Sequence, residues 1–231
     1  MDLNKAEKIL IEAIQNTPKN QIWVNDDQNS LLPERGITIN FILQLYSLNP
    51  SYFFNSCDNL YFSGEYEKVI NKKITYPDII FHGGQNNIAN QIFACEIKKF
   101  PSIKAPSNHH LLFYDFYKLV NYLYLKRWNK KELKYDDADY KMVYMILIDS
   151  DKKDFSNLLR SFKLSSLNKN RKKEVQSIRM IRRYLHDEKK QNRLRIILIP
   201  KNYDKKIDIL SLEDIIHTVP EFQRLIESIK P

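Results

Sequence analysis

The sequence predicts an α/β fold in which a mixed central β-sheet is flanked by helices. Segments with a helical spacing of apolar residues alternate with short apolar runs, in the order α-β-β-β-α-β between residues 30 and 150. This alternation is typical of domains that pack helices on a sheet. The 231 residues can bury one substantial core. We expect a single domain, with its core at about 30–150 and a basic helical extension at about 151–231.

Helices are expected where apolar residues recur every three or four positions. The segment 31–48 has such a stripe at Ile37, Phe41 and Leu45, and Pro33 near its start favours a first helical turn. Short apolar runs bounded by turn formers indicate strands. The remaining expected helices are 3–16, 109–128, 151–163, 170–189, 211–217 and 220–229, and the expected strands are 58–67, 77–82, 91–98, 140–149 and 193–200.

Two short motifs, Pro77-Asp78 and Glu96-Ile97-Lys98, lie on neighbouring expected strands. Alternate side chains of a strand share a face, so Glu96 and Lys98 project to the same side. A hairpin between the strands would bring Asp78 beside Glu96. Two close carboxylates repel unless a cation lies between them, and hard oxygen ligands suit Mg²⁺, with Mn²⁺ as a substitute. The motifs therefore predict a metal site in which Lys98 orients a water or neutralises charge on a phosphate, with proton acceptance also open.

A simpler explanation of the same residues stays open at this point. Asp before a strand and Glu-x-Lys within one also occur as strand punctuation and as solvent-facing ion pairs. Phe93, Cys95 and Ile97, however, make the second strand largely apolar, and a buried Glu and Lys are unfavourable unless they serve a ligand. Glu34 also has two explanations, as a partner of its own helix dipole or as a carboxylate that faces the metal site.

Five segments together resemble one family. PERGITINFILQL, GEYEK, YPDIIFHGG, FACEIKK and YDFYKL, within residues 30–150, are similar to a restriction-endonuclease-like family of the PD-(D/E)xK nuclease superfamily. The resemblance implies a restriction-endonuclease-like core in which Asp78 and Glu96 bind the metal and Lys98 is catalytic. It further implies that Glu34 of the early helix belongs to the catalytic set. It also implies a supporting role for Glu65, Asp115 and Lys118.

The net charge of +9 is concentrated in the last part of the chain. Residues 1–149 hold 17 basic and 17 acidic residues, whereas residues 150–231 hold 20 and 11. Such an excess predicts contact with nucleic-acid phosphates that weakens as salt rises. A solvated helix face in a lysine-rich chain is the alternative. The candidate phosphate-contacting residues are Lys169, Arg171, Lys172, Lys173, Arg179, Arg182 and Arg183.

Some other side chains have both a structural and a functional explanation. His82 shares a strand face with Asp78 by alternation, which makes a supporting role an expectation. The adjacent His109 and His110 at a helix start are expected to form a capped, partly exposed pair. Tyrosines at helical spacing are usually core or rim residues, and base stacking is the functional alternative for Tyr114, Tyr117, Tyr122 and Tyr124.

Several classes of protein find no support in the sequence. It has no apolar run of about 20 residues and no basic leader followed by an apolar stretch, so we expect a cytoplasmic protein without a membrane partner. Cys57 and Cys95 lack metal or redox spacing, which predicts free thiols in a reducing compartment. Phosphate-loop, dinucleotide-binding and nucleophile-elbow motifs are also missing.

Together these patterns predict a Mg²⁺-dependent endonuclease that hydrolyses phosphodiester bonds of DNA, in restriction or in defence against foreign DNA. The expected partner is double-stranded DNA. A homodimer is an expectation only because two-strand cleavage is easiest with two-fold symmetry. The alternatives are a catalytically silent nucleic-acid-binding module of the same fold, and a nuclease for RNA or for branched DNA in repair. Substrate choice depends on loops and assembly, which the sequence does not define.

Overall fold

The computed structural model of the chain describes most of the residues between Leu3 and Ser228. Cys57, Glu65 and Lys169, which the sequence singled out, lie outside the described residues, and Arg171, Lys172 and Lys173 are described at the level of the backbone. The described residues are 3–24, 30–50, 61–64, 68–70, 73–75, 77–82, 91–129, 134–137, 139–162, 171–201 and 207–228.

The chain divides into two compact units, each built from segments that are separate in sequence. Unit 1 comprises Met1–Ile97 and Tyr124–Met142, and unit 2 comprises Lys98–Leu123 and Val143–Pro231. The division passes through β5 (Gln91–Lys99) and through β8 (Met142–Ile148). The C-terminal residues beyond 150 therefore belong to the same compact unit as residues 98–123.

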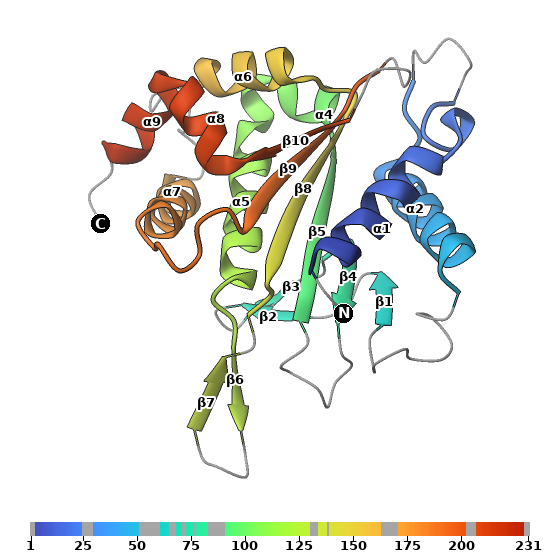
Figure 1. Ribbon diagram of the computed structural model, residues 1–231. Helices are drawn as coiled ribbons and strands as arrows, with labels where there is room; N and C mark the ends of the chain where they lie inside the picture. Colours follow the sequence, from blue (N-terminus) through green and yellow to red (C-terminus); the bar gives the residue numbers. More distant parts are fainter. Residues whose placement is uncertain are drawn as a thin grey trace. The chain divides into compact units, whose positions relative to one another are not determined.

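Two helices of unit 1, α1 (Leu3–Asn16) and α2 (Glu34–Leu48), pack against each other and are drawn in blue in Figure 1. The short helix η1 (Lys19–Gln21) lies between them in sequence. α2 begins directly after Pro33, and its predicted stripe is buried at Ile37, Phe41 and Leu45. α1 buries one apolar face with helical spacing, made of Ala6, Ile9, Leu10, Ala13 and Ile14.

In the described part of unit 1, the strands β1 (Tyr61–Gly64), β4 (Ile79–His82) and β5 run antiparallel in the order β1-β4-β5. Ile79 lies opposite Cys95, and the register shifts at His82, which lies opposite Gln91. All of β4 is buried, as is β5 up to Ile97, which is typical of strands covered on both faces. Two separate hairpins pair β2 with β3 (Lys68–Ile70, Lys73–Thr75) and β6 with β7 (Lys126–Asn129, Lys134–Asp137).

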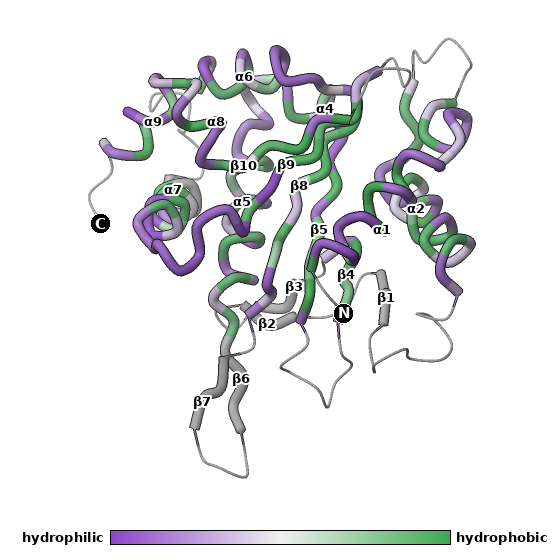
Figure 2. Tube along the Cα trace, in the orientation of Figure 1, coloured by the Kyte–Doolittle hydropathy of each residue, from purple (hydrophilic) through white to green (hydrophobic). Residues whose placement is uncertain are grey.

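In unit 2, the described strands β8, β9 (Leu194–Ile199) and β10 (Asp208–Ser211) are hydrogen-bonded in that order. β8 and β9 are parallel, and β10 is antiparallel to β9. Parallel pairing requires a long crossover, which here contains α6 (Lys152–Ser161) and α7 (Arg171–Leu185). β8 is buried along its whole length, and Figure 2 shows the isoleucine-rich end of β9 as hydrophobic.

The helices of unit 2 include α5 (His109–Tyr122), which contacts α7 and follows α4 (Phe100–Lys104) and η4 (Pro106–Asn108). The Phe113 ring of α5 lies 4.8 Å from Phe162 and 6.3 Å from Phe222 between centroids. Phe222 belongs to α9 (Pro220–Glu227), which follows α8 (Leu212–Thr218). Residues beyond 150 thus contribute aromatic side chains to the core around α5. Of the described helices, none combines the length and apolar character needed to cross a bilayer.

The coarse fold class predicted from the sequence is confirmed, because each unit combines helices with strands and unit 2 has a mixed sheet. The predicted helix 109–128 was too long, since α5 ends at Tyr122 and the chain enters β6 at Lys126. Residues 124–128 include Tyr124 and Trp128, whose aromatic rings favour strands, and the pairing with β7 prevails over the helical spacing. The two hairpins, β10 and α4 had not been predicted.

Candidate functional site

The hairpin of β4 and β5 brings the two candidate metal ligands to neighbouring positions. Because Ile79 pairs with Cys95, Asp78 and Glu96 are the next residues along the two strands. The antiparallel pairing that the turn residues predicted is therefore confirmed. Both acids lie in unit 1, so their proximity is set by one local element.

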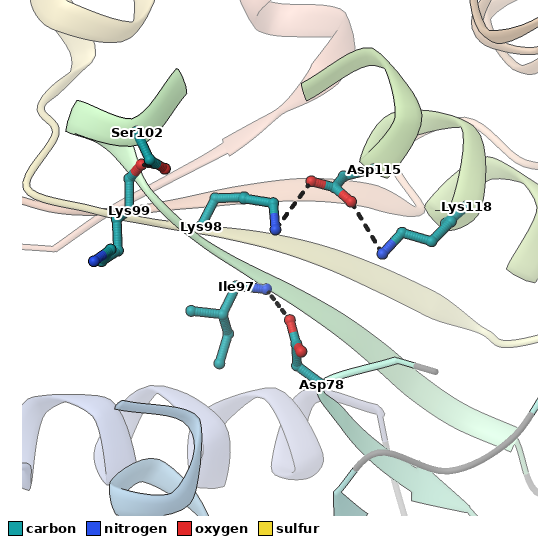
Figure 3. A network of polar contacts seen from close by, with 7 residues as sticks. All are labelled: Asp78, Ile97, Lys98, Lys99, Ser102, Asp115 and Lys118. Atoms are coloured by element: carbon teal, nitrogen blue, oxygen red, sulfur yellow. Dashed lines mark hydrogen bonds and ion pairs between the residues drawn. The ribbon is translucent and has the colours of Figure 1, made fainter. Parts of the chain in front are cut away.

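Asp78 is attached to the backbone of β5 at two points. Its N–H donates to the carbonyl of Cys95 at 2.9 Å, and its carboxylate Oδ2 accepts from the N–H of Ile97 at 2.6 Å (Figure 3). Pro77, the preceding residue, has no N–H to extend the strand pairing. The Asp78 side chain supplies an acceptor where the β4 ladder ends, and this contact holds the carboxylate in a defined orientation.

Glu96 is a buried acid in an apolar strand. Its exposed fraction is 1%, and Cys95 and Ile97 on either side are fully buried. Burial, followed by the charges of Asp78 and Glu96, raises the pKa of the Cys95 thiol well above its ordinary value. Both carboxylates therefore act on the same sulfur atom. A carboxylate this buried is unfavourable unless a cation or hydrogen-bond donors compensate its charge.

The donor chemistry of Asp78 and Glu96 fits a divalent metal ion. Mg²⁺ and Mn²⁺ prefer hard carboxylate oxygens, and Mg²⁺ commonly takes one or two carboxylates and completes its coordination with water. Within the described ranges, no group of three or more His, Cys, Asp or Glu side chains is arranged to hold a metal. Glu34 is half-buried in the first turn of α2 and does not form such a group with the two acids.

Lys98 forms a cluster of ion pairs within unit 2. Its Nζ lies 3.5 Å from Asp115 Oδ2, and the Nζ of Lys118 lies 3.0 Å from Asp115 Oδ1 (Figure 3). The Asp115 side chain is 3% exposed, whereas those of Lys98 and Lys118 are 18% and 12% exposed. The Lys98–Asp115–Lys118 cluster therefore contains two ammonium groups and one carboxylate in a mostly buried place. These contacts join three residues that the sequence had identified separately.

The neighbouring lysine, Lys99, does not share this cluster. Figure 3 shows the Lys99 side chain directed away from Asp115. The hydroxyl of Ser102 donates to the Lys99 carbonyl at 2.6 Å, which is a contact with the main chain of Lys99. Strand alternation thus separates Lys98 from Lys99, and Lys99 is a natural control for substitutions at Lys98.

The basic residues of α7 divide between its surface and its border. Arg179 and Arg183 are exposed, and Arg182 is half-buried. The opposite face of the helix is buried through Ile178, Ile181 and Tyr184. Exposure of two arginines is compatible with phosphate contact and equally with a solvated face, so their role in nucleic-acid binding stays a prediction. The roles of Glu65 and Lys169, which lie outside the described residues, also stay predictions.

The histidines and tyrosines differ from one another in ways that the sequence did not reveal. His109 is 3% exposed, so the prediction of a partly exposed pair was wrong for it, although His110 is half-buried. The His109 ring lies 4.5 Å from the ring of Phe162 between centroids. Tyr122 is fully buried, whereas Tyr114 on the same helix is 40% exposed. His82 is 5% exposed in β4, and its supporting role stays a prediction.

A cavity of about 360 Å³ lies elsewhere in unit 2. Its lining comes from the C-terminal end of α7, the loop that follows it, α8 and α9, and includes Glu213 and His217. No residue that the sequence identified as a candidate lines it. The cavity and the carboxylate–lysine site therefore have no side chain in common.

No known protein is similar enough to this chain for a function to be transferred from it. Comparison of the chain with protein-family models, with curated proteins and with solved structures gives no match.

Proposed function

We propose that the chain is a metal-dependent endonuclease that hydrolyses phosphodiester bonds of DNA, with the restriction-endonuclease-like core that its sequence resembles. One observation carries the proposal: Asp78 and Glu96 lie at neighbouring positions of a buried hairpin, and Lys98 follows in the same strand. Glu96 is 1% exposed, and a carboxylate is seldom buried in an apolar strand without a group that compensates its charge. Two carboxylates can hold a divalent ion for phosphodiester hydrolysis, and a lysine can stabilise the charge that develops on the phosphate.

Asp78 and Glu96 would hold Mg²⁺, which when bound polarises a phosphate oxygen and lowers the pKa of a water molecule. The chain itself defines where this chemistry takes place. The Ile97 N–H orients the Asp78 carboxylate, and the buried strand restricts Glu96 to one position. Residues fixed by the main chain need little reorganisation when substrate binds, which favours catalysis.

Lys98 supplies positive charge on the same strand. Its ion pair with Asp115 favours the ammonium form, so we assign Lys98 to the stabilisation of charge on the phosphate rather than to proton acceptance. Lys118 occupies the other oxygen of Asp115, and Asp115 therefore orients Lys98 without cancelling its charge. Asp115 and Lys118 are positioning residues in this scheme.

The wider assignment rests on the sequence. Exposed arginines of α7, Arg179 and Arg183, would contact the DNA backbone. A cytoplasmic location, a role in restriction or defence, and a homodimer that cuts both strands complete the proposal. Salt dependence of binding is the sign expected of phosphate contacts.

The test is cleavage of plasmid DNA by the purified protein with Mg²⁺, with Mn²⁺ and with EDTA, followed by sequencing of the product ends. Glu96→Gln, Asp78→Asn and Lys98→Met should each lower the cleavage rate by about 100-fold or more, because each removes one charge from the site. Asn is preferred to Ala at Asp78, since Ala would also remove the acceptor for the Ile97 N–H.

Lys99→Met is the matched control and should cleave as the wild type does, because its side chain is directed away from Asp115. Circular dichroism checks that each variant is folded. Cleavage at the wild-type rate by folded Glu96→Gln would refute the assignment. DNA binding without cleavage under any metal condition would instead favour the catalytically silent module.

A further inference from the structure

We propose that the outer face of α2 is the contact surface of a homodimer, in which α2 packs antiparallel against α2 of a second copy of this chain. This outer face is defined by Gly36, Ile39, Leu43 and Tyr46. The inference deepens the proposed function, because it gives a surface to the homodimer that the proposal includes. The surface itself is argued from unit 1 alone.

The outer face of α2 is apolar, as is the inner face that packs in the core. Ile39, Leu43 and Tyr46 recur at the spacing of one helix face and are 53%, 57% and 37% exposed. Single exposed apolar side chains are ordinary at a protein surface. Here, however, residues 36–49 include no charged residue, in a chain of which 28% is charged. A helix that is apolar on all sides is typically covered by a neighbour.

The neighbouring helix α1 shows what a solvated face is like in the same unit. It packs on α2 and buries one apolar face, while Lys5, Lys8 and Glu12 are exposed along another side. The charged residues of α2 are Glu34 and Arg35, both in its first turn. The uncharged outer face is therefore a property of α2 and not of unit 1 as a whole.

The glycine of this face is not explained by packing within the chain. A Cβ added at Gly36 would meet no atom of the described residues within 4 Å, so no close neighbour there requires a glycine. Glycine is among the least favourable residues in a helix, because it loses the most conformational freedom. What glycine does permit is the close approach of another backbone. A second helix packed on the outer face of α2 would use the space that Gly36 leaves open.

A second copy of the chain fits this face better than a nucleic acid or a membrane does. Both of those surfaces are bound through lysines and arginines, and residues 36–49 include neither. Two copies of an uncharged face bring no like charges together, although the whole chain carries a net charge of +9. Antiparallel packing places Leu43 of one copy opposite the space at Gly36 of the other. It also keeps the two Arg35 side chains at opposite ends of the contact, whereas parallel packing would bring them together.

The experiment is sedimentation velocity of the purified full chain between about 5 and about 500 µM, without DNA or metal. We expect a reversible monomer–dimer equilibrium with a dissociation constant on the order of 100 µM. The dimer is weak because one pair of 15-residue helices buries less than the roughly 1,200 Å² of a standard interface. Salt screens charges but not apolar contacts, so a rise from about 0.15 to about 0.5 M NaCl should change the dissociation constant by less than about twofold.

Three variants locate the contact. Leu43→Glu places a carboxylate of each copy in an apolar interface and should raise the dissociation constant at least about tenfold. Leu111→Glu is the matched control at an exposed leucine of α5 and should dimerise as the wild type does. Gly36→Ala should raise the urea midpoint of the monomer, because alanine favours the helix, and should still weaken the dimer about fivefold. Circular dichroism checks that each variant is folded.

A monomer over the whole concentration range would overturn the proposal, as would a dimer that folded Leu43→Glu or Gly36→Ala leaves as tight as the wild type. An equal loss in Leu111→Glu, or growth into species larger than a dimer, would also overturn it, because a two-fold contact closes on itself. Failure of the dimer is distinguishable from failure of the nuclease assignment, since association is measured without DNA or metal and the nuclease by cleavage with Mg²⁺.

Discussion

Asp115 compensates the charge of two lysines at once. Its side chain is 3% exposed, and its two oxygens pair with Lys98 and Lys118. Removal of one partner from a buried ion pair is strongly destabilising, because the remaining charge stays buried without compensation. In this cluster one carboxylate serves two ammonium groups, so its removal should affect stability more than removal of either lysine.

We expect Asp115→Ala to lower the free energy of unfolding by about 3 kcal/mol, since it removes the carboxylate that pairs with two mostly buried ammonium groups. Lys118→Met should lower it by only about 1 kcal/mol, because Asp115 keeps Lys98 as its partner and the methionine retains aliphatic packing. Urea denaturation followed by circular dichroism gives both values. Glu188→Ala at an exposed position is the control and should stay within about 0.5 kcal/mol. Equal stability of the Asp115 and Lys118 variants would contradict this account.

At the scale of the element, α5 begins with a histidine that belongs to the core. The His109 ring packs edge-on against Phe162 at 4.5 Å, and its Nε2 lies 3.4 Å from the Lys104 carbonyl. Among the described residues, its buried Nδ1 has no hydrogen-bond partner. Burial, partly offset by the Lys104 carbonyl, lowers the pKa of His109 below 6.5. The ring is therefore held neutral, with the proton on Nε2 as donor to Lys104.

Protonation of His109 should weaken the packing at the start of α5. Because its folded pKa is the lower one, the unfolded chain takes up the proton first, and stability present above pH 6.5 is lost as the pH falls through the folded pKa. The urea midpoint of the wild type should drop between about pH 7.5 and about pH 5.5, and His109→Phe should reduce that drop. The matched variant His110→Phe should retain it. A drop of the same size in all three proteins would exclude His109 as the cause.

The spacing of apolar residues in the sequence was enough to predict those helices whose buried face lies within one continuous segment. α1 matches the predicted 3–16, because its apolar face is complete in one segment. The pairing of Asp78 with Glu96 also followed from local signals, two strand motifs and a turn. The prediction of a helix over 109–128 was wrong at its C-terminal end. Residues 126–129 form β6 by pairing with β7, and the periodicity of one segment does not detect a partner strand. The exposure of Tyr114 and the bond from Ile97 to Asp78 depend on tertiary packing and could not be predicted.

At the scale of the whole molecule, the two units are interleaved along the chain. Residues 98–123 and 143–231 together make unit 2, so neither unit is a continuous segment that a single cut would release. Within unit 2, β8 pairs with β9, and Phe113 packs against Phe162 and Phe222. The elements beyond residue 150 therefore complete the core around α5.

A fragment that ends at residue 150 tests this arrangement. It keeps the motifs but loses β9, α7 and α9, so β8 loses its parallel partner strand β9 and α5 loses its contacts with α7. We expect the fragment 1–150 to unfold without a cooperative thermal transition and to bind a hydrophobic dye, while the full chain unfolds cooperatively. The measurements are near-ultraviolet circular dichroism and dye fluorescence. Cooperative unfolding of the fragment would show that residues 1–150 fold independently.

The attachment of Asp78 to the Ile97 N–H has a consequence for how descendants of this chain would diverge. If the proposed catalysis were lost, an aspartate that completes a strand pairing would remain useful, because its replacement would leave a main-chain donor without its acceptor. Selection for folding alone can therefore preserve Asp78. Glu96 carries a charged group in an otherwise apolar stretch. Its replacement by an apolar residue would remove the desolvation penalty of burying that charge. Retention of Glu96 is accordingly the more informative mark of a lineage that keeps the proposed activity.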